Sequence, residues 1–217
     1  MPEAVAGDAR LTGKLQQGAE RLGLTLTSEQ LRNLMLYLGL LAKWNRAYNL
    51  TAIRNTDEMV NLHLLDSLAI SQHLGTAQHI IDVGTGPGLP GVVLAIMHPE
   101  RKFTLLDSNG KKTRFLFQAK TALKLDNVTI VNGRVEAYEP PQPFDMITSR
   151  AFASLQDMVQ WCRHLLADGG CFLAMKGQFP QDELDALPAD IQLQSSLELE
   201  VPGVEGQRHL LRLVIGS

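Results

Sequence analysis

From His79 onward the chain alternates short apolar segments with stretches of helical periodicity, and this alternation restricts the possible folds more than any other feature of the sequence. Five segments bounded by turn residues have the composition of buried parallel strands; they are residues 79–83, 102–107, 127–132, 144–148 and 171–176. Helical patterns lie between them, at about 90–97, 110–124 and 155–166. Alternation at this spacing predicts an α/β fold: a doubly wound, mostly parallel sheet with helices on both faces.

The two ends of the chain depart from this alternation. Residues 192–201 and 208–215 read as two strands joined by the turn residues 202–206, which predicts an antiparallel C-terminal hairpin and seven strands in all. From Leu11 to about Gln72 the pattern is helical instead. We therefore expect a small helical N-terminal domain (residues 1–75) followed by a Rossmann-like domain (residues 76–217).

Two helices stand out in the N-terminal part. Thr27 and Gln30 form a capping-box pattern ahead of a helix with one buried apolar stripe, whose members are Leu31, Leu34, Leu38, Leu41 and Trp44. Asp57 is a candidate cap for a second helix.

The segment from Asp82 to Gly91, DVGTGPGLPG, follows the first predicted strand and opens the first helix after it. Its glycines at 84, 86 and 88 fit G-x-G-x-G, whereas a dinucleotide fingerprint would need a third glycine where this chain has Leu89. Pro87 and Pro90 remove two of the N–H groups that a pyrophosphate requires. The turn therefore favours a ligand without phosphates.

Acidic residues follow the same strand ends. Asp107 ends the second predicted strand, where a carboxylate can accept hydrogen bonds from ribose hydroxyls, and Glu136 follows the third. Together with Asp82 they would repel phosphates and favour a nucleoside that carries a sulfonium and an ammonium group, as S-adenosylmethionine does. Each also has a plainer interpretation, since Asp107 could cap the helix near Gly110 and any of them could be solvated.

Composition limits the class of protein without naming a function. With 45% hydrophobic residues, 20% charged residues and a net charge of −3, the chain is typical of a globular protein and lacks the basic balance of a general nucleic-acid binder. The N-terminus has no apolar signal region, and no apolar run approaches the roughly 20 residues of a membrane span, so we expect a cytoplasmic location. Cys162 and Cys171 form neither a disulfide framework nor a metal cluster, so we expect core thiols and no metal.

Six segments of the chain form a characteristic set of motifs: 43–51 (KWNRAYNLT), 63–67 (HLLDS), 82–91, 105–108 (LLDS), 149–152 (SRAF) and 176–177 (KG). With these motifs the chain resembles, from about residue 28 to the C-terminus, the RsmG (GidB) family of bacterial 16S ribosomal RNA guanine-N7 methyltransferases. One departure is Leu62, because family members often carry arginine before the histidine of the His63–Ser67 stretch.

The resemblance implies a class I S-adenosylmethionine-dependent methyltransferase fold and methylation of one guanine in the decoding-region loop of 16S ribosomal RNA, without a metal. By similarity, Gly84 and Leu89 line the cofactor, Val135 and Glu136 flank its adenosine end, and Arg150 lies at the site. With the residues chosen from the strand ends, the expected cofactor-binding set is Asp82, Gly84, Gly86, Gly88, Leu89, Asp107, Val135, Glu136 and Arg150.

The chemistry of other methylation targets fits the sequence less well. Guanine N7 presents a lone pair, so methyl transfer to it needs positioning rather than a base. Exocyclic-amine methylases usually carry an Asn/Asp-Pro-Pro-Tyr/Phe motif after the fourth strand, where this chain has Ser149 to Phe152. Cytosine C5 methylation requires a cysteine nucleophile, but Cys162 falls in a helical stretch and Cys171 begins a strand.

Arg150 and Lys176 are the candidate catalytic residues, because each follows a predicted strand of the parallel sheet. We expect Arg150 to bind guanine O6, a phosphate or the cofactor carboxylate; a structural ion pair is the alternative. Phe152 and Phe179 could stack on an extruded base or simply pack in the core. The cations expected to contact RNA are Lys43, Arg46, Arg54, Lys111, Lys112 and Arg114. His63 and Asp66 are expected to fix the helical domain against the cofactor loop.

Three other functions remain open at this point. They are methylation of another RNA or a small molecule, a nucleotide-linked oxidoreductase, and a non-catalytic RNA-binding assembly factor. The preferred hypothesis is a monomeric enzyme that acts on 16S ribosomal RNA, within the small ribosomal subunit.

Overall fold

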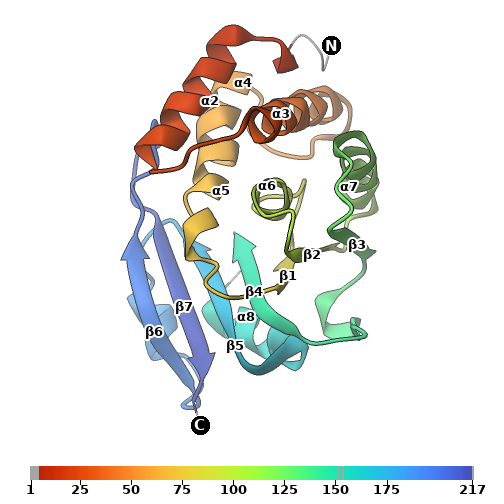
Figure 1. The fold of residues 1–217 in the computed structure, drawn as a ribbon. Helices are drawn as coiled ribbons and strands as arrows, with labels where there is room; N and C mark the ends of the chain where they lie inside the picture. Colours follow the sequence, from red (N-terminus) through yellow and green to blue (C-terminus); the bar gives the residue numbers. More distant parts are fainter. Residues whose placement is uncertain (1–4, 151, 153, 217) are drawn as a thin grey trace.

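A computed structural model of the chain describes residues 5–150, 152 and 154–216. Ala151, part of the predicted Ser149–Phe152 motif, lies outside the described residues. A seven-stranded sheet runs in the order β3-β2-β1-β4-β5-β7-β6. Figure 1 shows the N-terminal helices gathered at one end of the molecule and the β6–β7 hairpin along one side of the sheet.

The first five strands are parallel, and β7 runs antiparallel to both β5 and β6. The strands are β1 (His79–Val83), β2 (Lys102–Asp107), β3 (Val128–Asn132), β4 (Phe144–Arg150), β5 (Leu166–Lys176), β6 (Ile191–Glu198) and β7 (His209–Ile215). The predicted fold class and C-terminal hairpin are confirmed. Strand β5 begins five residues before the predicted start, because Leu166 pairs with Phe144 ahead of an irregularity in β4.

Helices cover both faces of the sheet. They are α2 (Ala9–Arg21), α3 (Ser28–Tyr48), α4 (Thr56–Met59), the π-helical η1 (Val60–Leu65), α5 (Asp66–Leu68), the 3-10 turn η2 (Ser71–His73), α6 (Gly91–Met97), α7 (Gly110–Leu123), η3 (Val135–Ala137), α8 (Leu155–Cys162), η4 (Arg163–Leu165) and α9 (Gln181–Asp185). Alternation along β5 separates the two faces: Leu173 joins the apolar cluster with the N-terminal helices, and Phe172 joins the cluster beneath α8.

The capping box predicted for α3 is present. Thr27 Oγ1 accepts from the Gln30 N–H at 3.1 Å, and Gln30 Oε1 accepts from the Thr27 N–H at 2.9 Å. The buried surface of α3 is wider than the predicted stripe and includes Met35 and Leu40, because α3 contacts α2 as well as α6 and α7.

The predicted cap of the second helix was wrong. The Asn55 side chain accepts from the Asp57 N–H and caps α4, while the Asp57 carboxylate pairs with Arg10 and Lys14 of α2. A carboxylate in the first turn of a helix is favourable without being the cap.

The N-terminal helices share one apolar cluster with the sheet. Leu11 and Leu38 belong to the same cluster as Ile80 of β1 and Phe103 of β2. The boundary between residues 75 and 76 as a domain limit stays a prediction. Among the described residues, no helix combines the length and apolar character needed to cross a membrane.

Candidate cofactor and substrate site

The turn after β1 depends on glycine backbone geometry. Gly84, Gly86 and Gly88 have φ angles of 65°, 62° and 103°, which side chains disfavour. At Gly91 a Cβ would lie 2.2 Å from Leu105 Cδ2, so the start of α6 can approach β2 closely only without a side chain. Gly84 differs, since it is exposed and a Cβ there would meet nothing within 4 Å. The turn therefore has an open side at Gly84.

The amides of Gly86, Gly88, Leu89 and Gly91 in this turn already have partners inside the protein. The N–H of Gly86 donates to Asp107 Oδ2 at 2.8 Å, and the N–H of Gly91 donates to Asp82 Oδ2 at 2.8 Å. Gly88 and Leu89 both donate to the carbonyl of Thr85, at 3.0 and 2.9 Å. A pyrophosphate needs free N–H donors. The geometry thus agrees with the sequence argument against a dinucleotide.

Asp82 lies beneath the turn rather than at its open side. It is completely buried; Oδ2 accepts from the Thr85 hydroxyl at 2.6 Å as well as from Gly91, and Oδ1 has no partner among the described residues. Burial raises the pKa of Asp82 to about 7. These contacts fit a residue that shapes the turn, and direct contact with a cofactor stays a prediction.

Asp107 links the end of β2 to the same turn. Its Oδ2 accepts from Gly86, and its Oδ1 accepts from the Asn109 N–H at 2.8 Å. Asn109, rather than Asp107, caps α7, so the plainer interpretation of Asp107 as that cap is wrong. Across the sheet end, Glu136 is exposed in η3 beside the buried Val135.

These residues fit S-adenosylmethionine chemically. Gly84 leaves room for a ligand, and the turn amides described above have no free N–H group to offer a phosphate. The carboxylates of Asp107 and Glu136 suit a positively charged nucleoside. The contacts predicted for Gly84, Leu89, Val135 and Glu136 stay predictions.

Tyr37 of α3 also holds the turn, a contact that sequence reasoning missed. Its buried hydroxyl donates to the Pro87 carbonyl at 2.8 Å. Nearby, the Trp44 ring lies 5.8 Å from the Phe115 ring of α7. The helical segment is therefore attached to the cofactor turn through Tyr37. No local pattern distinguishes this tyrosine from the other buried residues of α3.

His63 and Asp66 were predicted to fix the helical domain against the cofactor turn. Among the described residues, none of their side-chain hydrogen bonds reaches that turn, and Asp66 instead pairs with Arg150 at the end of β4. Arg150 Nη1 donates to the Leu62 carbonyl at 2.9 Å and to Asp66 Oδ2 at 3.0 Å. Asp66 is buried, and its Oδ1 accepts from Arg208 Nε at 3.0 Å. Arg150 is thus in the ion pair that was the alternative interpretation, and Arg208 is a site residue that sequence reasoning missed.

His63 is a buried, neutral side chain at neutral pH. Burial, with the nearby Arg150 charge, lowers the pKa of His63 to about 4. Its Nδ1 lies 3.1 Å from the Leu62 carbonyl and its Nε2 lies 3.0 Å from Thr51 Oγ1. A neutral ring that donates from Nδ1 and accepts at Nε2 satisfies both contacts.

A cavity of about 460 Å³ opens beside these residues. It is lined by Ile53, Leu62, His63, Asp66, Arg150, Met175, Lys176, Gly177, Leu199, Arg208 and His209. This volume lies within the range of small-ligand sites. The structure brings both predicted catalytic residues, Arg150 and Lys176, to one cavity at the carboxyl ends of β4 and β5.

Lys176 is engaged in an ion pair of its own. Its Nζ lies 3.0 and 2.8 Å from the two carboxylate oxygens of Glu183 in α9. Glu183 also accepts from the Leu155 N–H at 2.7 Å, so it connects β5 to the start of α8.

The aromatic and cysteine candidates have protein neighbours. The Phe152 ring lies 5.6 Å from that of Trp161, and the half-exposed Phe179 packs edge-on against His209. Cys162 and Cys171 are buried free thiols, and burial raises the pKa of Cys162 to about 12. The prediction of core thiols is confirmed.

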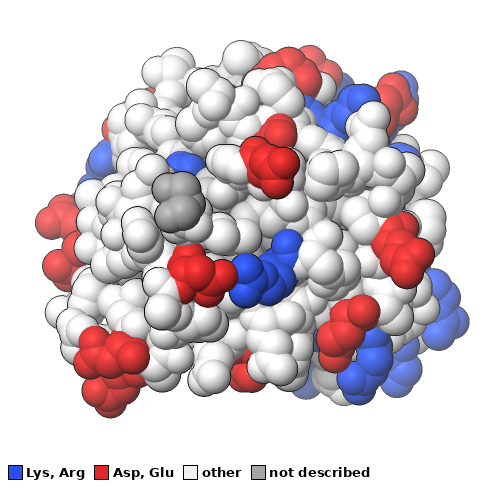
Figure 2. All heavy atoms as spheres, turned by 90° about the horizontal axis from the view of Figure 1, so that it is seen from below, with Lys and Arg blue, Asp and Glu red and all other residues white. Residues whose placement is uncertain are grey.

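The six cations expected to contact RNA lie on α3, α7 and the loop after α3. No ion pair between described residues involves Lys43, Arg46, Arg54, Lys111, Lys112 or Arg114. The contact between Trp44 and Phe115 brings the end of α3 beside the start of α7. By contrast, the face in Figure 2 carries basic and acidic side chains scattered among uncharged ones.

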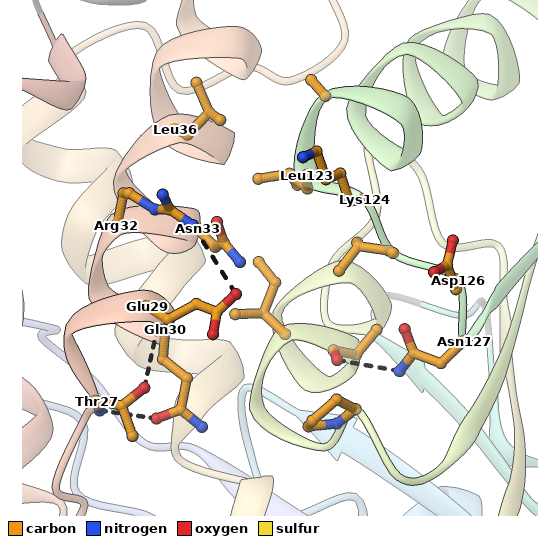
Figure 3. Close-up of a pocket in the computed structure, with 15 residues that line it drawn as sticks. Thr27, Glu29, Gln30, Arg32, Asn33, Leu36, Leu123, Lys124, Asp126 and Asn127 are labelled. Atoms are coloured by element: carbon orange, nitrogen blue, oxygen red, sulfur yellow. Dashed lines mark hydrogen bonds and ion pairs between the residues drawn. The ribbon is translucent and has the colours of Figure 1, made fainter.

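A second cavity, of about 640 Å³, lies between the start of α3 and the ends of α6 and α7. In Figure 3, the residues from Thr27 to Leu36 at the start of α3 lie on one side of it, and the residues from Leu123 to Asn127 lie on the other. Several of their polar groups are used within the protein: Thr27 and Gln30 form the cap of α3, and Asn127 Nδ2 donates to the Ala95 carbonyl at 3.1 Å. None of the predicted site residues lines this cavity.

Solved methyltransferase structures share the fold. The glycopeptide N-methyltransferase MtfA superposes with a TM-score of 0.60 at 12% identity, covering 71% of this chain and 97% of that chain. The ribosomal protein L11 methylase from Lactobacillus delbrueckii subsp. bulgaricus gives a TM-score of 0.55 at 15% identity, covering 70% and 77%. The likeness at these identities concerns the fold, which is that of class I methyltransferases.

Sequence relatives are much closer. "Ribosomal RNA small subunit methyltransferase G" of Ectopseudomonas mendocina (strain ymp) is 58% identical over 201 residues, which cover 92% of this chain and 94% of the relative. The protein of the same name from Pseudomonas putida (strain F1) is 55% identical, covering 92% and 93%. Residues 30–211 match the family described as GidB, rRNA small subunit methyltransferase G. The chain belongs to the rRNA small subunit methyltransferase G (GidB) family.

Proposed function

We propose that this chain transfers the methyl group of S-adenosylmethionine to N7 of a guanine in the decoding-region loop of 16S ribosomal RNA. The observation that carries the proposal is the family's glycine turn, whose amides from Gly86 to Gly91 are bonded internally, prolines aside, and whose Gly84 side is open. This combination suits a nucleoside cofactor without phosphates. We further propose that the chain acts as a monomer in the cytoplasm, where ribosomal RNA is found.

The residues divide into a cofactor part and a substrate part. Gly84, Leu89, Val135 and Glu136 would hold the cofactor, which supplies an electrophilic methyl group on a sulfonium when bound. Arg150 and the cavity beside it lie at the neighbouring strand ends, where a target base can be placed.

Methyl transfer to guanine N7 needs no proton removal, and the site agrees with that requirement. The neutral His63 is already bonded through both ring nitrogens, and Lys176 is paired with Glu183. Neither is free to act as a base. Catalysis therefore rests on the orientation of the base toward the methyl group.

The unpaired cations of α3 and α7 support an RNA substrate. A net charge of −3 makes a local basic surface the means of binding, and it favours a pre-shaped ribosomal particle over free RNA. Exposed Tyr48 lies at the end of α3 within this surface.

The test is to incubate the protein with labelled S-adenosylmethionine and small ribosomal subunits that lack the modification, and then to map the label. We expect label at N7 of one guanine in the decoding-region loop, and weaker labelling of protein-free 16S RNA. Label on another base would exclude the proposal. Binding of small subunits without any transfer would identify a non-catalytic assembly factor, and binding of NAD would support an oxidoreductase.

A further inference from the structure

We propose that Asp66, Arg150 and Arg208 form an anion site that binds one RNA phosphate next to the target base, with Asp66 as the positioning residue. The inference rests on the proposed function, since it names how the same site holds its RNA. It adds Arg208 to the residues that touch substrate.

The cluster carries more positive than negative charge. One buried carboxylate, that of Asp66, is shared by two guanidinium groups, each 3.0 Å away. The side chains of Arg150 and Arg208 are 23% and 27% exposed, so the cluster is partly desolvated yet reachable. An uncompensated guanidinium in such a place attracts an anion.

Donor groups remain available on both arginines. Among the described residues, Arg150 donates through Nη1, and Arg208 donates through Nε to Asp66 and through Nη1 to the Gln207 carbonyl. The Nη2 groups of both arginines have no partner in the described part of the chain. Because Asp66 fixes the near edges of both guanidiniums, their remaining N–H groups are held in place, and phosphate oxygens accept well from such planar donors.

The other residues that line the cavity leave the net positive charge of the Asp66, Arg150 and Arg208 cluster unchanged. Lys176 is neutralised by Glu183, and His63 is held neutral by burial. Leu62, Met175 and Leu199 supply an apolar wall. A base can pack against such a wall while its phosphate reaches the arginines.

The charge of the product indicates that the arginines do not bind the reacting nitrogen, guanine N7. Guanine methylated at N7 is cationic, so bare guanidinium groups at N7 would oppose the reaction. A phosphate is the anion that RNA itself brings to the cavity. The cofactor carboxylate is the competing anion, and it is distinguished by the test below.

The first variant is Arg208→Gln, with Arg163→Gln as its control, because Arg163 is paired with Asp190 away from the cavity. We expect Arg208→Gln to raise KM for small subunits about 10-fold or more, as expected for loss of a charged hydrogen bond. We also expect it to reduce the slope of log binding constant against log salt by about one. Its affinity for S-adenosylmethionine, measured by calorimetry, should be unchanged, and Arg163→Gln should behave as wild type.

The second variant is Asp66→Asn, with Asp57→Asn as its control, because Asp57 also accepts from two cations but lies outside the cavity. Asp66→Asn should lower kcat/KM about 10-fold or more through misplaced arginines, and Asp57→Asn should not. Since Asp66→Asn leaves two cations without their carboxylate and can impair folding, the decisive comparison is Arg208→Gln, whose folding is checked by thermal denaturation.

A binding measurement without turnover separates this inference from the proposed function. In an NMR titration of the protein loaded with S-adenosylhomocysteine, guanosine 5′-monophosphate should bind about 10-fold more tightly than guanosine, and Arg208→Gln should remove the difference. Equal affinity of wild type for the two ligands overturns the inference, even if methylation proceeds. Weakened cofactor binding in Arg208→Gln, with an unchanged KM for small subunits, would assign the arginines to the cofactor carboxylate instead.

Discussion

Asp82, a single residue beneath the glycine turn, holds the conformation of the turn and makes the stability of the protein depend on pH. Asp82 is ionisable, completely buried and bonded through only one carboxylate oxygen among the described residues. A carboxylate in this position costs desolvation free energy that its two hydrogen bonds only partly offset. The pKa of about 7 expresses that balance.

This balance predicts a pH-dependent stability. Because the folded pKa of Asp82 is raised above its ordinary 3.8, the folded state binds more protons between pH 4 and 7, and stability falls as pH rises through that window. Asp82→Asn should remove this decline. The difference in free energy of unfolding between the variant and wild type should therefore shift in favour of the variant by roughly a few kcal/mol as the pH is raised from 4 to 7.5. Urea denaturation at several pH values measures it. Parallel curves for the two proteins would contradict the assignment.

Two glycine substitutions should have opposite effects on stability. A Cβ at Gly91 would lie 2.2 Å from Leu105 Cδ2 and 2.7 Å from Asp82 Oδ2, so Gly91→Ala should destabilise the protein by about 1–3 kcal/mol. Gly13 lies inside α2 with nothing within 4 Å of its Cβ position, and Gly13→Ala should stabilise by about 0.5–1 kcal/mol. Thermal denaturation of both variants checks the pair. A destabilised Gly13→Ala would show that the helix needs its glycine.

At the scale of elements, the π-helix η1 shapes the surroundings of Arg150. The Asp66 N–H donates to the Asn61 carbonyl, five residues back, and to the His63 carbonyl, while the Leu62 carbonyl accepts from Arg150. The wider turn therefore places a carbonyl and the Asp66 carboxylate on the same guanidinium. Single-turn π-helices are frequent at functional sites.

Helix α3 is the element that connects the N-terminal segment to the cofactor turn. Tyr37→Phe should keep the packing but leave the Pro87 carbonyl without its donor, which should cost about 1–2 kcal/mol of stability and weaken S-adenosylmethionine binding several-fold. Calorimetry with the cofactor and thermal denaturation measure the two effects. Tyr48→Phe is the matched control, because Tyr48 is exposed at the end of the same helix. Equal losses in both variants would rule out a specific role for the Tyr37 hydroxyl.

At the scale of the whole molecule, the substrate cavity combines parts that are distant along the chain. The N-terminal segment supplies Asp66, the sheet supplies Arg150, and the loop before β7 supplies Arg208. The apolar cluster shared by the N-terminal helices and the sheet holds these parts in register. The cavity consequently depends on the packing of the helical segment against the sheet.

The charge distribution of the whole molecule predicts where RNA binds. The double variant Lys111→Gln, Arg114→Gln at the start of α7 should weaken binding to small subunits and reduce the salt slope by up to about two, without changing cofactor affinity. The variant Lys120→Gln, Lys124→Gln at the other end of α7 makes the same charge change and serves as the control. Lys124 lies beside the start of α3, away from the end of α3 that carries Lys43 and Arg46. Filter binding at several salt concentrations provides the measurement. Equal effects of the two double variants would indicate general electrostatics rather than a defined surface.

The sequence by itself determined the features that depend on local patterns. Strand and helix alternation predicted the sheet and its hairpin, Thr27 and Gln30 predicted the start of α3, and the spacing of Gly84, Gly86 and Gly88 predicted a turn unsuited to phosphates. The motifs around these positions predicted the family, which the sequence relatives confirm.

Only the tertiary structure decided which side chains share a partner. Asp66 meets Arg150 and Arg208 across 84 and 142 residues of chain, and Tyr37 meets Pro87 across 50. Such contacts arise when elements pack, and no local spacing encodes them. For the same reason Asn55 rather than Asp57 was found to cap α4, since a first-turn carboxylate and a cap look alike in sequence and differ only in where the side chain points.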